Sequence, residues 1–574
     1  MYMRTGQISD IPTRVDRAAE SWTPSPGAGL IGTLLIDQAD LTAVERFSQY
    51  HEDAPGPLQG RYYSALLPAT PPGPGQQLAF EVDLDLCSGC KACVATCHAL
   101  NGLGDSEAWR DVGLLVGTSA SLPVIQHVTS ACHHCVEPAC MSACPVEAYE
   151  KDPHTGIVRH LDDQCIGCQY CTLACPYDAP KYQPDLGIVR KCDMCSDRLQ
   201  AGEAPACVQA CPHEAIRIRV VDVAEVVQRA EAGTFLSSTP DPGYTQPSTV
   251  YLSARPLSPD EVRSADDHRL RPEHAHMPLV AMLVLTQLSV GGFLVEFAAR
   301  FARPSEGLGT LALPVLCLAF GFAGLAASLL HLGRPLYAYR AVLGLRHSWL
   351  SREILAFGIF AKLAGAYVAL RWVAPDWSEG RPFLMISLLG AVIVAGVSGV
   401  ACSVMVYHVV RRPFWRARLS GPKFAGTTVV LGLALALTSL GAVTSGPPGK
   451  ITKQAAAFLP PIAFVLIAAT CLKLWFESRA TLDADESTHR SLWKTNLLLR
   501  GWLKRPAGLR RFLGLAGGVM MPMFAAVGAI SGDPGAAIAA SVLALTATLC
   551  GELTERYLFF TAVVKMKMPG GPLS

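Results

Sequence analysis

The sequence carries almost no net charge and few motifs that mark familiar kinds of protein. Its 48 Lys and Arg residues are balanced by 47 Asp and Glu, for a net charge of +1. The basic surface that nucleic-acid binding requires is therefore not expected, and we predict no nucleic-acid partner. A nucleophile elbow and a phosphate-binding Walker loop are also missing, so the sequence shows no motif for a substrate pocket.

The first twenty residues contain neither an apolar run nor a twin-arginine pair, so no export signal is predicted. Cysteine, in contrast, is abundant. Of the 20 cysteines, sixteen lie between Cys87 and Cys211, and four are scattered through apolar segments. A disulfide scaffold would be short and exported. Dense thiols without an export signal instead favour metal ligation in a reducing compartment.

Changes in composition predict four regions along the chain. Residues 1–78 form a soluble extension, in which "DLTAVERFSQYHE" predicts an amphipathic helix, and residues 79–220 hold the clustered cysteines. Residues 221–277 are rich in Pro, Ser and charge, which predicts an extended connector laid over the surface. Residues 278–564 are strongly apolar.

The apolar region contains eight segments long enough to cross a bilayer, which takes about 20 residues of helix. These segments are 278–299, 309–332, 353–374, 383–409, 424–444, 456–477, 512–530 and 535–563. The loops after the second, fourth and sixth segments are rich in Lys and Arg, whereas the loops between them are poorer. By the positive-inside rule the basic loops are cytoplasmic. An even number of spans then places the cysteine region on the cytoplasmic side of a bacterial inner membrane.

The sixteen clustered cysteines fall into four groups of four. The groups are Cys87, Cys90, Cys93 and Cys97; Cys132, Cys135, Cys140 and Cys144; Cys165, Cys168, Cys171 and Cys175; and Cys192, Cys195, Cys207 and Cys211. The first and third groups read C-x2-C-x2-C-x3-C, and the last three groups are followed by Pro145, Pro176 and Pro212.

This spacing is typical of iron–sulfur ligation. Three cysteines in a tight loop reach three corners of one cubane, and a fourth that leaves on a short helix reaches the neighbouring cluster. Sixteen thiolates thus predict four [4Fe–4S] clusters. Zinc ribbons use C-x2-C pairs with longer gaps and have no need of a third nearby cysteine. The predicted fold is an α+β double ferredoxin-like iron–sulfur domain followed by an all-α bundle of eight transmembrane helices.

The ending "KCDMCSDRLQAGEAPACVQACP" and the four groups resemble the electron-transfer subunit of the dimethyl sulfoxide reductase family of molybdoenzymes. The apolar half resembles the eight-helix anchor subunit of the same family, through "EHAHMPLVAMLVLTQLSVGGF", "SLLHLGRPLYAY", "SREI" and "GELTERYLFF". The chain is therefore expected to be a fusion of two subunits that are usually separate. The resemblance covers about residues 80–564 and leaves out the N-terminal extension.

The resemblance implies that the four cysteine groups pair in nested order, although spacing alone leaves consecutive pairing open. The implied ligand sets are Cys87, Cys90, Cys93 and Cys211; Cys192, Cys195, Cys207 and Cys97; Cys132, Cys135, Cys140 and Cys175; and Cys165, Cys168, Cys171 and Cys144. Some related enzymes replace one ligand with tryptophan and hold a three-iron cluster. Here Cys168 is kept, so four cubanes are expected.

The resemblance also implies a quinol-oxidising site that contains His331 and Glu353. An imidazole suits the role of proton acceptor, and ionisable residues within a membrane are candidates for function. The structural alternatives are that His331 caps a helix and that Glu353 pairs with Arg352 or Arg334. We expect Glu552 and Arg556 to form a structural ion pair, Gln287 to hydrogen bond between helices, and Glu296 to be unrelated to the site.

Three functions are compatible with the sequence. The first is electron transfer and membrane anchoring in anaerobic respiration, from menaquinol or ubiquinol to a separate molybdopterin-containing catalytic subunit. In the second, the same chain runs in reverse, from a subunit that oxidises sulfite or another substrate to quinone. The third is a membrane scaffold that binds metal without redox work. Nothing in the sequence sets the direction of electron flow, because cluster potentials depend on surroundings.

Overall fold

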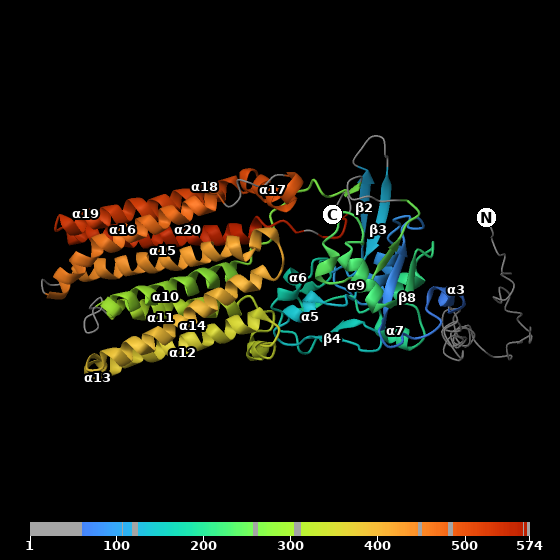
Figure 1. Ribbon diagram of the computed structural model, residues 1–574, viewed down its shortest axis with the longest axis horizontal. Coiled ribbons are helices and arrows are strands. Elements are labelled where there is room, and N and C mark those ends of the chain that lie inside the picture. Colours follow the sequence, from blue (N-terminus) through green and yellow to red (C-terminus); the bar gives the residue numbers. More distant parts are fainter. Residues whose placement is uncertain are drawn as a thin grey trace, which may run out of the picture. The chain divides into compact units, whose positions relative to one another are not determined.

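The computed structural model describes residues 60–105, 107–117, 124–255, 262–302, 311–445, 450–479, 486–565 and 567–570. The chain divides into two units, residues 1–64 and 65–574. Of the first unit only α3 (Gly60–Tyr63) and the start of η2 (Ser64–Leu66) are described, so the predicted amphipathic helix of the extension lies outside the described residues. The second unit contains both the cysteine region and the membrane helices (Figure 1).

Short antiparallel sheets form the frame of the cysteine region. One three-stranded sheet has the order β8-β1-β9, another has the order β10-β2-β3, and two hairpins pair β4 with β5 and β6 with β7. The strands are β1 (Gln76–Asp83), β2 (Asp111–Gly117), β3 (Ile125–Ser130), β4 (Tyr149–Lys151), β5 (Val158–His160), β6 (Lys181–Gln183), β7 (Ile188–Arg190), β8 (Ile216–Asp222), β9 (Val250–Leu252) and β10 (Val262–Ser264).

Five short helices follow the cysteine loops. They are α4 (Ala92–Leu100), α5 (Ala139–Ala143), α6 (Tyr170–Ala174), α7 (Ser196–Gln200) and α8 (Ala206–Gln209). Helix α4 packs against α8, and α5 packs against α6, so the first cysteine group meets the fourth and the second meets the third. The predicted ferredoxin-like fold is confirmed.

The connector differs from the extended segment that its composition predicts. It contains α9 (Val223–Glu231), the 3-10 turn η3 (Pro242–Tyr244), β9 and β10. Strand β9 lies parallel to β1, and β10 pairs with β2 in antiparallel fashion. The connector thus completes both three-stranded sheets, because the edges of β1 and β2 offer unpaired backbone groups that a passing chain can satisfy.

In the described part of the apolar half, eight helices are long and apolar enough to cross a membrane, as predicted. They are α10 (Met277–Ala302), α11 (Ala312–Leu329), α12 (Trp349–Val373), α14 (Pro382–His408), α15 (Ala417–Thr444), α16 (Lys450–Arg479), a seventh span formed by α18 (Lys504–Leu515), the π-helical turn η6 (Ala516–Met520) and α19 (Met521–Ile530), and α20 (Pro534–Thr561). The shorter elements between them are η4 (Pro335–Val342), α13 (Pro375–Glu379), η5 (Pro413–Trp415) and α17 (Glu486–Arg500).

Helices α10 and α15 form the centre of the bundle, with most of their apolar windows buried (Figure 1). They cross at Gly291 and Gly432, where a Cβ atom added to Gly291 would lie 1.8 Å from the carbonyl oxygen of Thr428. Only a residue without a side chain permits this approach, which is the usual reason for small residues at membrane helix crossings.

The chain after α20 returns to the cysteine domain. The amide of Leu114 in β2 donates to the carbonyl of Gly570 at 3.2 Å, and the amide of Gly570 donates to Asp266 Oδ1 at 3.2 Å. A Cβ atom on Gly113 would clash with the Pro569 carbonyl. The end of the described chain therefore ties the last membrane span to the sheet that carries β2.

Candidate iron–sulfur and quinol sites

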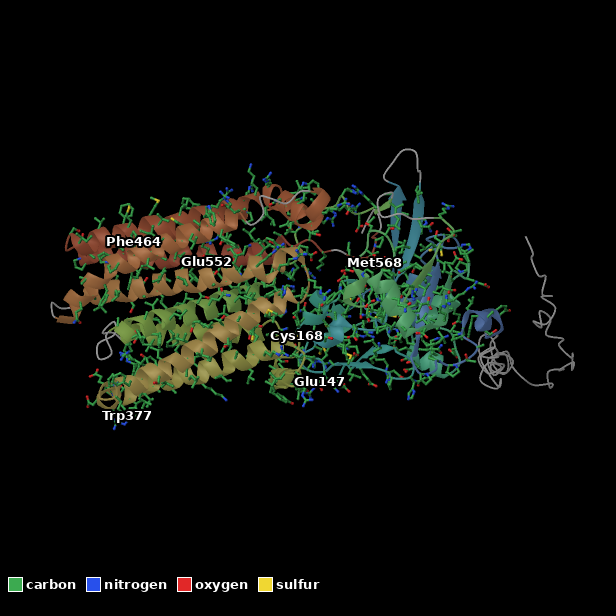
Figure 2. The ribbon with its side chains drawn as sticks, in the orientation of Figure 1. Glu147, Cys168, Trp377, Phe464, Glu552 and Met568 are labelled. Atoms are coloured by element: carbon green, nitrogen blue, oxygen red, sulfur yellow. The ribbon has the colours of Figure 1, made fainter. Side chains whose placement is uncertain are left out.

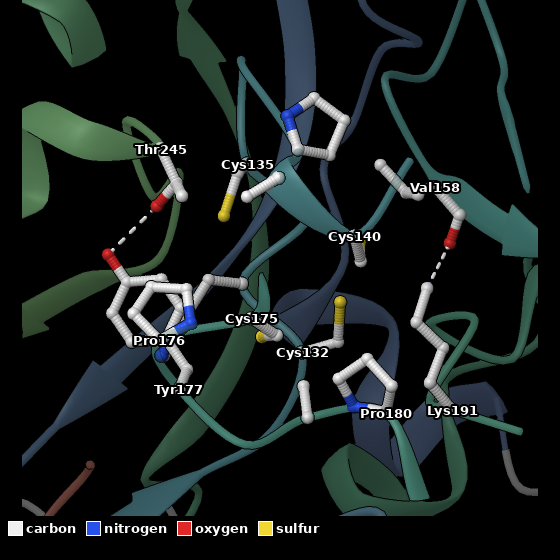
Figure 3. A pocket seen from close by; sticks show the side chains of 14 residues that line it. Cys132, Cys135, Cys140, Val158, Cys175, Pro176, Tyr177, Pro180, Lys191 and Thr245 are labelled. Atoms are coloured by element: carbon white, nitrogen blue, oxygen red, sulfur yellow. Dashed lines mark hydrogen bonds between the residues drawn. The ribbon is translucent and has the colours of Figure 1, made fainter. Parts of the chain in front are cut away.

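Cysteines from two different groups line one buried cavity. Its walls include Cys132, Cys135 and Cys140 from the second group and Cys175 from the third (Figure 3). Pro176, Pro180 and Tyr177 close one side, and Tyr177 is held by a hydrogen bond of 3.0 Å from Thr245 Oγ1 to its phenol oxygen. Four thiols around a dry, proline-lined cavity suit a thiolate-ligated cluster.

A second cavity brings together Cys87, Cys90 and Cys93 of the first group with Cys211 of the fourth. In both cavities three cysteines come from one group and the last cysteine from another. Both sets are those of the nested order and not of the consecutive order. The signal for this pairing lies in the packing of α4 on α8 and of α5 on α6, which spacing in the sequence does not reveal.

The remaining cysteines are also near their nested partners. Cys97 interacts electrostatically with Cys207 and Cys195, and burial with these neighbours raises the pKa of Cys97 to about 12. Cys144 is the corresponding neighbour of the third group, and its thiol interacts with those of Cys165, Cys168 and Cys171. A metal must displace these protons, since thiolate is the ligand.

Backbone amides point at several of the sulfur atoms. The amide of Gly167 donates to Cys165 Sγ at 3.4 Å, and that of Ala148 donates to Cys144 Sγ at 3.3 Å. The loops achieve this with residues in the left-handed conformation, such as Lys91 and Gln169, which directly precede α4 and α6. Hydrogen bonds to sulfur raise the potential of a bound cluster.

Two buried cations lie among the cysteines. Burial alone would lower the pKa of Arg110, but the thiolates of Cys207 and Cys93 raise it above its usual value. Lys191 behaves in the same way beside Cys132, and its Nζ donates to the carbonyls of Cys192, at 2.8 Å, and Val158. The positive charge of Arg110 and Lys191 offsets the negative charge of the clustered thiolates. The residues around the cysteines therefore fit a negatively charged cluster.

The third cysteine group lies at the membrane bundle. The phenol of Tyr170 donates to the Val406 carbonyl at 2.7 Å, and Ser348 Oγ donates to the Ala143 carbonyl at 2.7 Å. Figure 2 shows Cys168 at this junction, where α6 meets the ends of the helices. The cysteine domain therefore docks on one end of the bundle through buried contacts.

His331 lies just after α11, beside the third cysteine group. Its imidazole lies beside the backbone of Cys168, and burial lowers its pKa. Its imidazole meets that of His276 edge-on, with ring centroids 5.0 Å apart, and His276 meets His274 in the same way at 5.2 Å. Sequence reasoning missed His276 as a neighbour, because the contact joins segments far apart in the chain.

Glu353 is a buried carboxylate near the start of α12, 3% exposed. Its Oε1 accepts a hydrogen bond from Ser403 of α14. The two arginines considered as structural partners donate elsewhere: Arg352 to the carbonyls of Leu345 and Arg346, and Arg334 to that of Asp162. The alternative of an ion pair at Glu353 is therefore wrong. Tyr170 lies near enough to both Glu353 and Cys168 to interact with them electrostatically.

The predicted ion pair between Glu552 and Arg556 is also wrong. Glu552 (Figure 2) pairs with Lys473 of α16 and, at 3.0 Å, with Arg510 of α18. Arg556 pairs with the neighbouring Glu555 at 3.4 Å. Glu552 and Arg556 have different partners because Lys473, Arg510 and Glu555 lie between helices beside them.

Two further predictions concern polar residues of α10. The expected hydrogen bond of Gln287 between helices is confirmed, since its Oε1 accepts from Arg556 at 3.1 Å. Glu296 forms ion pairs with Arg300 at 2.8 Å and Arg371 at 3.0 Å and accepts from Tyr367 at 3.0 Å. These partners explain its burial without a role in the quinol site.

The fold and the site define an iron–sulfur electron-transfer domain joined in one chain to an eight-helix membrane anchor. Residues 124–221 match the family described as 4Fe-4S dicluster domain, and residues 272–561 match the family described as DMSO reductase anchor subunit. The protein belongs to the dimethyl sulfoxide reductase anchor subunit family, and it is a fusion of that anchor with an iron–sulfur electron-transfer subunit of the same molybdoenzyme type.

Relatives of the iron–sulfur part come from several enzymes. The protein is 35% identical over 187 residues to a chain of the anaerobic dimethyl sulfoxide reductase of Haemophilus influenzae, covering 30% of this sequence and 88% of that one. It is 38% identical over 143 residues to the thiosulfate reductase electron transfer subunit of Salmonella typhi, covering 24% and 74%. It is 32% identical over 161 residues to a sulfite dehydrogenase subunit of Allochromatium vinosum, covering 24% and 67%. The protein is thus a multi-pass membrane subunit that works with a catalytic partner.

Proposed function

We propose that the chain oxidises a membrane quinol, menaquinol or ubiquinol, beside His331 and Glu353 and delivers the electrons to a separate molybdopterin-containing subunit. The observation that carries this proposal is the position of His331 beside the backbone of Cys168, where the Gly333 amide donates to the Gly167 carbonyl at 3.4 Å. It joins a proton acceptor at the end of the bundle to a candidate cluster ligand. Oxidation of a quinol releases two protons and two electrons, so both kinds of acceptor are needed at one place.

The proposed ligands are the four nested sets given above, with four [4Fe–4S] clusters in all. The two cysteine-lined cavities support these sets. When bound, the clusters would carry electrons one at a time between the quinol and the catalytic partner.

Contacts between the sets support a linear order. Tyr149 interacts with both Cys171 and Cys140, which connects the set at the membrane to the next set. Cys192 interacts with Cys132, and Cys93 interacts with Cys207. The order ends at the set that contains Cys90, an exposed cysteine. We propose that the catalytic subunit docks there, because short distance to the surface favours electron exit.

The protons would leave through three imidazoles. His331 would accept the proton of one quinol hydroxyl and Glu353 that of the other, and His276 and His274 lead from His331 to the surface. The edge-on ring contacts support this path, and His274 is exposed whereas His276 and His331 are half-buried. A neutral imidazole can accept a proton on one ring nitrogen and release one from the other.

We propose that the iron–sulfur domain faces the cytoplasm of a bacterial inner membrane. The basic loops after the second, fourth and sixth spans lie on the side of this domain. Arg340 donates to the Asp163 carbonyl, Arg412 donates to the Leu173 carbonyl, and Lys494 donates to the Asp267 carbonyl. Loops rich in Lys and Arg remain on the cytoplasmic side.

The test is His331→Ala in the full chain, purified from membranes without oxygen. We expect reduction of the clusters by quinol to slow by about 10²-fold, since general base catalysis contributes at least this much. Iron and sulfide content and reduction by dithionite should stay at wild-type values. The control is His268→Gln, at an exposed histidine of the connector. A wild-type rate in His331→Ala would remove the proposed proton acceptor.

A second candidate function is the reverse reaction, from a substrate-oxidising subunit to quinone. The similarity to the sulfite dehydrogenase subunit of Allochromatium vinosum favours it. Co-purification from membranes, with mass identification of the partner and molybdenum analysis, separates the two. A reductase partner supports quinol oxidation, and a dehydrogenase partner supports quinone reduction.

A further inference from the structure

A pocket at the junction of the iron–sulfur domain and the bundle lies outside the proposed proton path, and it meets the proposed electron path only at Cys175, a proposed cluster ligand in its wall. This junction pocket has a volume of about 460 Å³. Its walls come from the loop 410–413 after α14, the segment 173–178, the turn at Tyr244 and the residues that follow α20. His331, His276 and Glu353 do not line it.

The junction pocket has an excess of positive charge. Lys565 and Lys567 on its wall are paired with Glu273 at 2.8 Å and Asp266 at 3.0 Å. The other three cations of the wall are Arg411, Arg412 and Arg416. Among the residues that the structure describes, none of these three arginines has a carboxylate within ion-pair distance.

Two carboxylates also line the pocket, but neither forms an ion pair with the arginines. Asp178 pairs with Lys181 at 2.6 Å, and Asp241 accepts from the amide of Gly243 at 2.9 Å. Arg412 is only 9% exposed, and burial lowers its pKa to about 10 despite more distant carboxylates. A buried guanidinium without an acidic partner is costly unless an anion comes to it.

The depth of the junction pocket in the membrane can be read from helix lengths. Helix α14 has 27 residues, and at about 1.5 Å per residue it is some 10 Å longer than the hydrocarbon core. The loop between α14 and α15 therefore lies at the level of lipid headgroups. Leu173, Val410 and Pro413 give the same pocket an apolar wall.

We propose that the junction pocket binds the phosphate headgroup of an anionic membrane phospholipid. Arg411 and Arg416 would bind the phosphate from the exposed side and Arg412 from the buried side. A guanidinium group suits this ligand because two of its N–H groups can donate to two phosphate oxygens at once. The apolar wall would contact the glycerol and the first acyl carbons. Basic pockets between membrane helices on this side of a bilayer are suited to such headgroups. This inference does not depend on the direction of electron flow.

The site is already partly organised for this role. Arg411 stacks on Tyr244 with its guanidinium 4.4 Å from the ring centroid, and Arg412 stacks on Trp415 at 4.6 Å. Stacking fixes the planes of both groups. Arg412 uses one of its N–H groups on the Leu173 carbonyl at 3.1 Å and has others for a phosphate. The bound lipid would thus also hold the iron–sulfur domain on the bundle, since Leu173 and Tyr244 belong to the former and Arg411 to the latter.

The experiment compares the full chain with the double variant Arg411→Gln/Arg416→Gln. The matched control is Arg418→Gln, an exposed arginine of the same region that does not line the pocket. Each protein is purified in mild detergent, stripped of lipid and titrated with phosphatidylglycerol or with phosphatidylcholine, and bound lipid is counted by native mass spectrometry. Iron content and size-exclusion profiles report on folding.

Wild type and the control should retain one phosphatidylglycerol in preference to phosphatidylcholine, and the double variant should bind it about 30-fold more weakly. The double variant Arg411→Lys/Arg416→Lys should recover part of the affinity. Equal retention by the glutamine variant, or no preference for the anionic lipid, would overturn the proposal. Displacement of phosphatidylglycerol by millimolar inorganic phosphate would assign the pocket to free phosphate instead.

Discussion

Two buried carboxylates of the membrane bundle have opposite surroundings. Glu552 of α20 is 1% exposed and contacts Lys473, Arg510 and, at 2.8 Å, Thr427 Oγ1. Glu353 of α12 is 3% exposed, and the contact found for it is the Ser403 hydroxyl. The two cations beside Glu552 account for its burial and indicate a role in stabilising the fold. Among the described residues, the partner of Glu353 is a hydroxyl, and no cation compensates for the burial of its carboxylate beside an electron-transfer domain.

The surroundings of Glu552 extend over four helices. Glu477 pairs with Arg510 at 2.9 Å and with Lys473 at 3.5 Å, and Glu555 pairs with Lys423 at 3.6 Å. These residues join α15, α16, α18 and α20, the half of the bundle farther from the proposed quinol site. The comparison therefore supports a stabilising role for Glu552 and the role in chemistry that we propose for Glu353, and each role can be tested separately.

The largest expected effect is on assembly. Glu552→Ala removes the more deeply buried of the two carboxylates that Lys473 and Arg510 share, since Glu477 remains. A broken buried ion pair costs about 3–5 kcal/mol. We expect little folded protein in membranes, measured by size-exclusion of a fluorescent fusion. Normal amounts of monodisperse Glu552→Ala would contradict the stabilising role of the network.

Glu353→Gln should have the opposite phenotype. The amide keeps the shape and a hydrogen bond to Ser403, so the protein should accumulate with full iron content. Reduction of the clusters by quinol should fall by about 10²-fold, because the amide cannot accept a proton. Stopped-flow bleaching of the iron–sulfur absorption measures this rate. Loss of folded protein together with loss of rate would place Glu353 in the same class as Glu552.

His276→Gln should give a smaller effect, of about tenfold on the same rate, since His331 remains as the first acceptor. The exposed His268 of the same connector provides the matched variant His268→Gln, which should leave the rate unchanged. A slower rate in both variants would mean that the connector tolerates substitution poorly. In that case the imidazole path would lose its support.

The pH dependence should be the mildest effect. Burial and the neighbouring His331, His274, Lys565 and Arg412 lower the pKa of His276 to about 4. A lowered pKa means that the neutral, proton-accepting form persists as the pH falls below 6.5, and is lost only near pH 4. The quinol-dependent rate of wild type, compared with His276→Gln, should keep its advantage down to about pH 5. An advantage that halves near pH 6.5 would contradict this.

The elements with strong local signals could be predicted from the sequence. All eight spans appear as apolar runs, and the four cysteine groups carry their chemistry in their spacing. The short strands β9 and β10 could not be read, because three residues of strand are too few for a periodic pattern and their pairing depends on the open edges of β1 and β2. The composition of the connector predicts a loop, and tertiary pairing overrides it.

The partners of ionisable residues were the least predictable part of the site. Proximity in sequence suggested Arg556 for Glu552 and Arg352 for Glu353, and both pairings were wrong. Glu552 pairs with cations from helices distant in the chain, and the helix that faces Glu353 contributes a hydroxyl. The contact of His276 with His331 arises in the same way, from the docking of the start of α10 against the end of α11. The periodicity of a sequence shows which residues share one face of a helix, but it does not show which residue of another helix packs against that face.

The most direct test of the central claim is anaerobic mixing of the wild-type full chain, reconstituted in lipid, with menaquinol or ubiquinol. The account predicts about sixteen iron and sixteen sulfide per chain and rapid bleaching of their absorption by quinol, with partial reversal by quinone. Protein that contains zinc, or that holds iron and sulfide but does not exchange electrons with either form of the quinone, would contradict it.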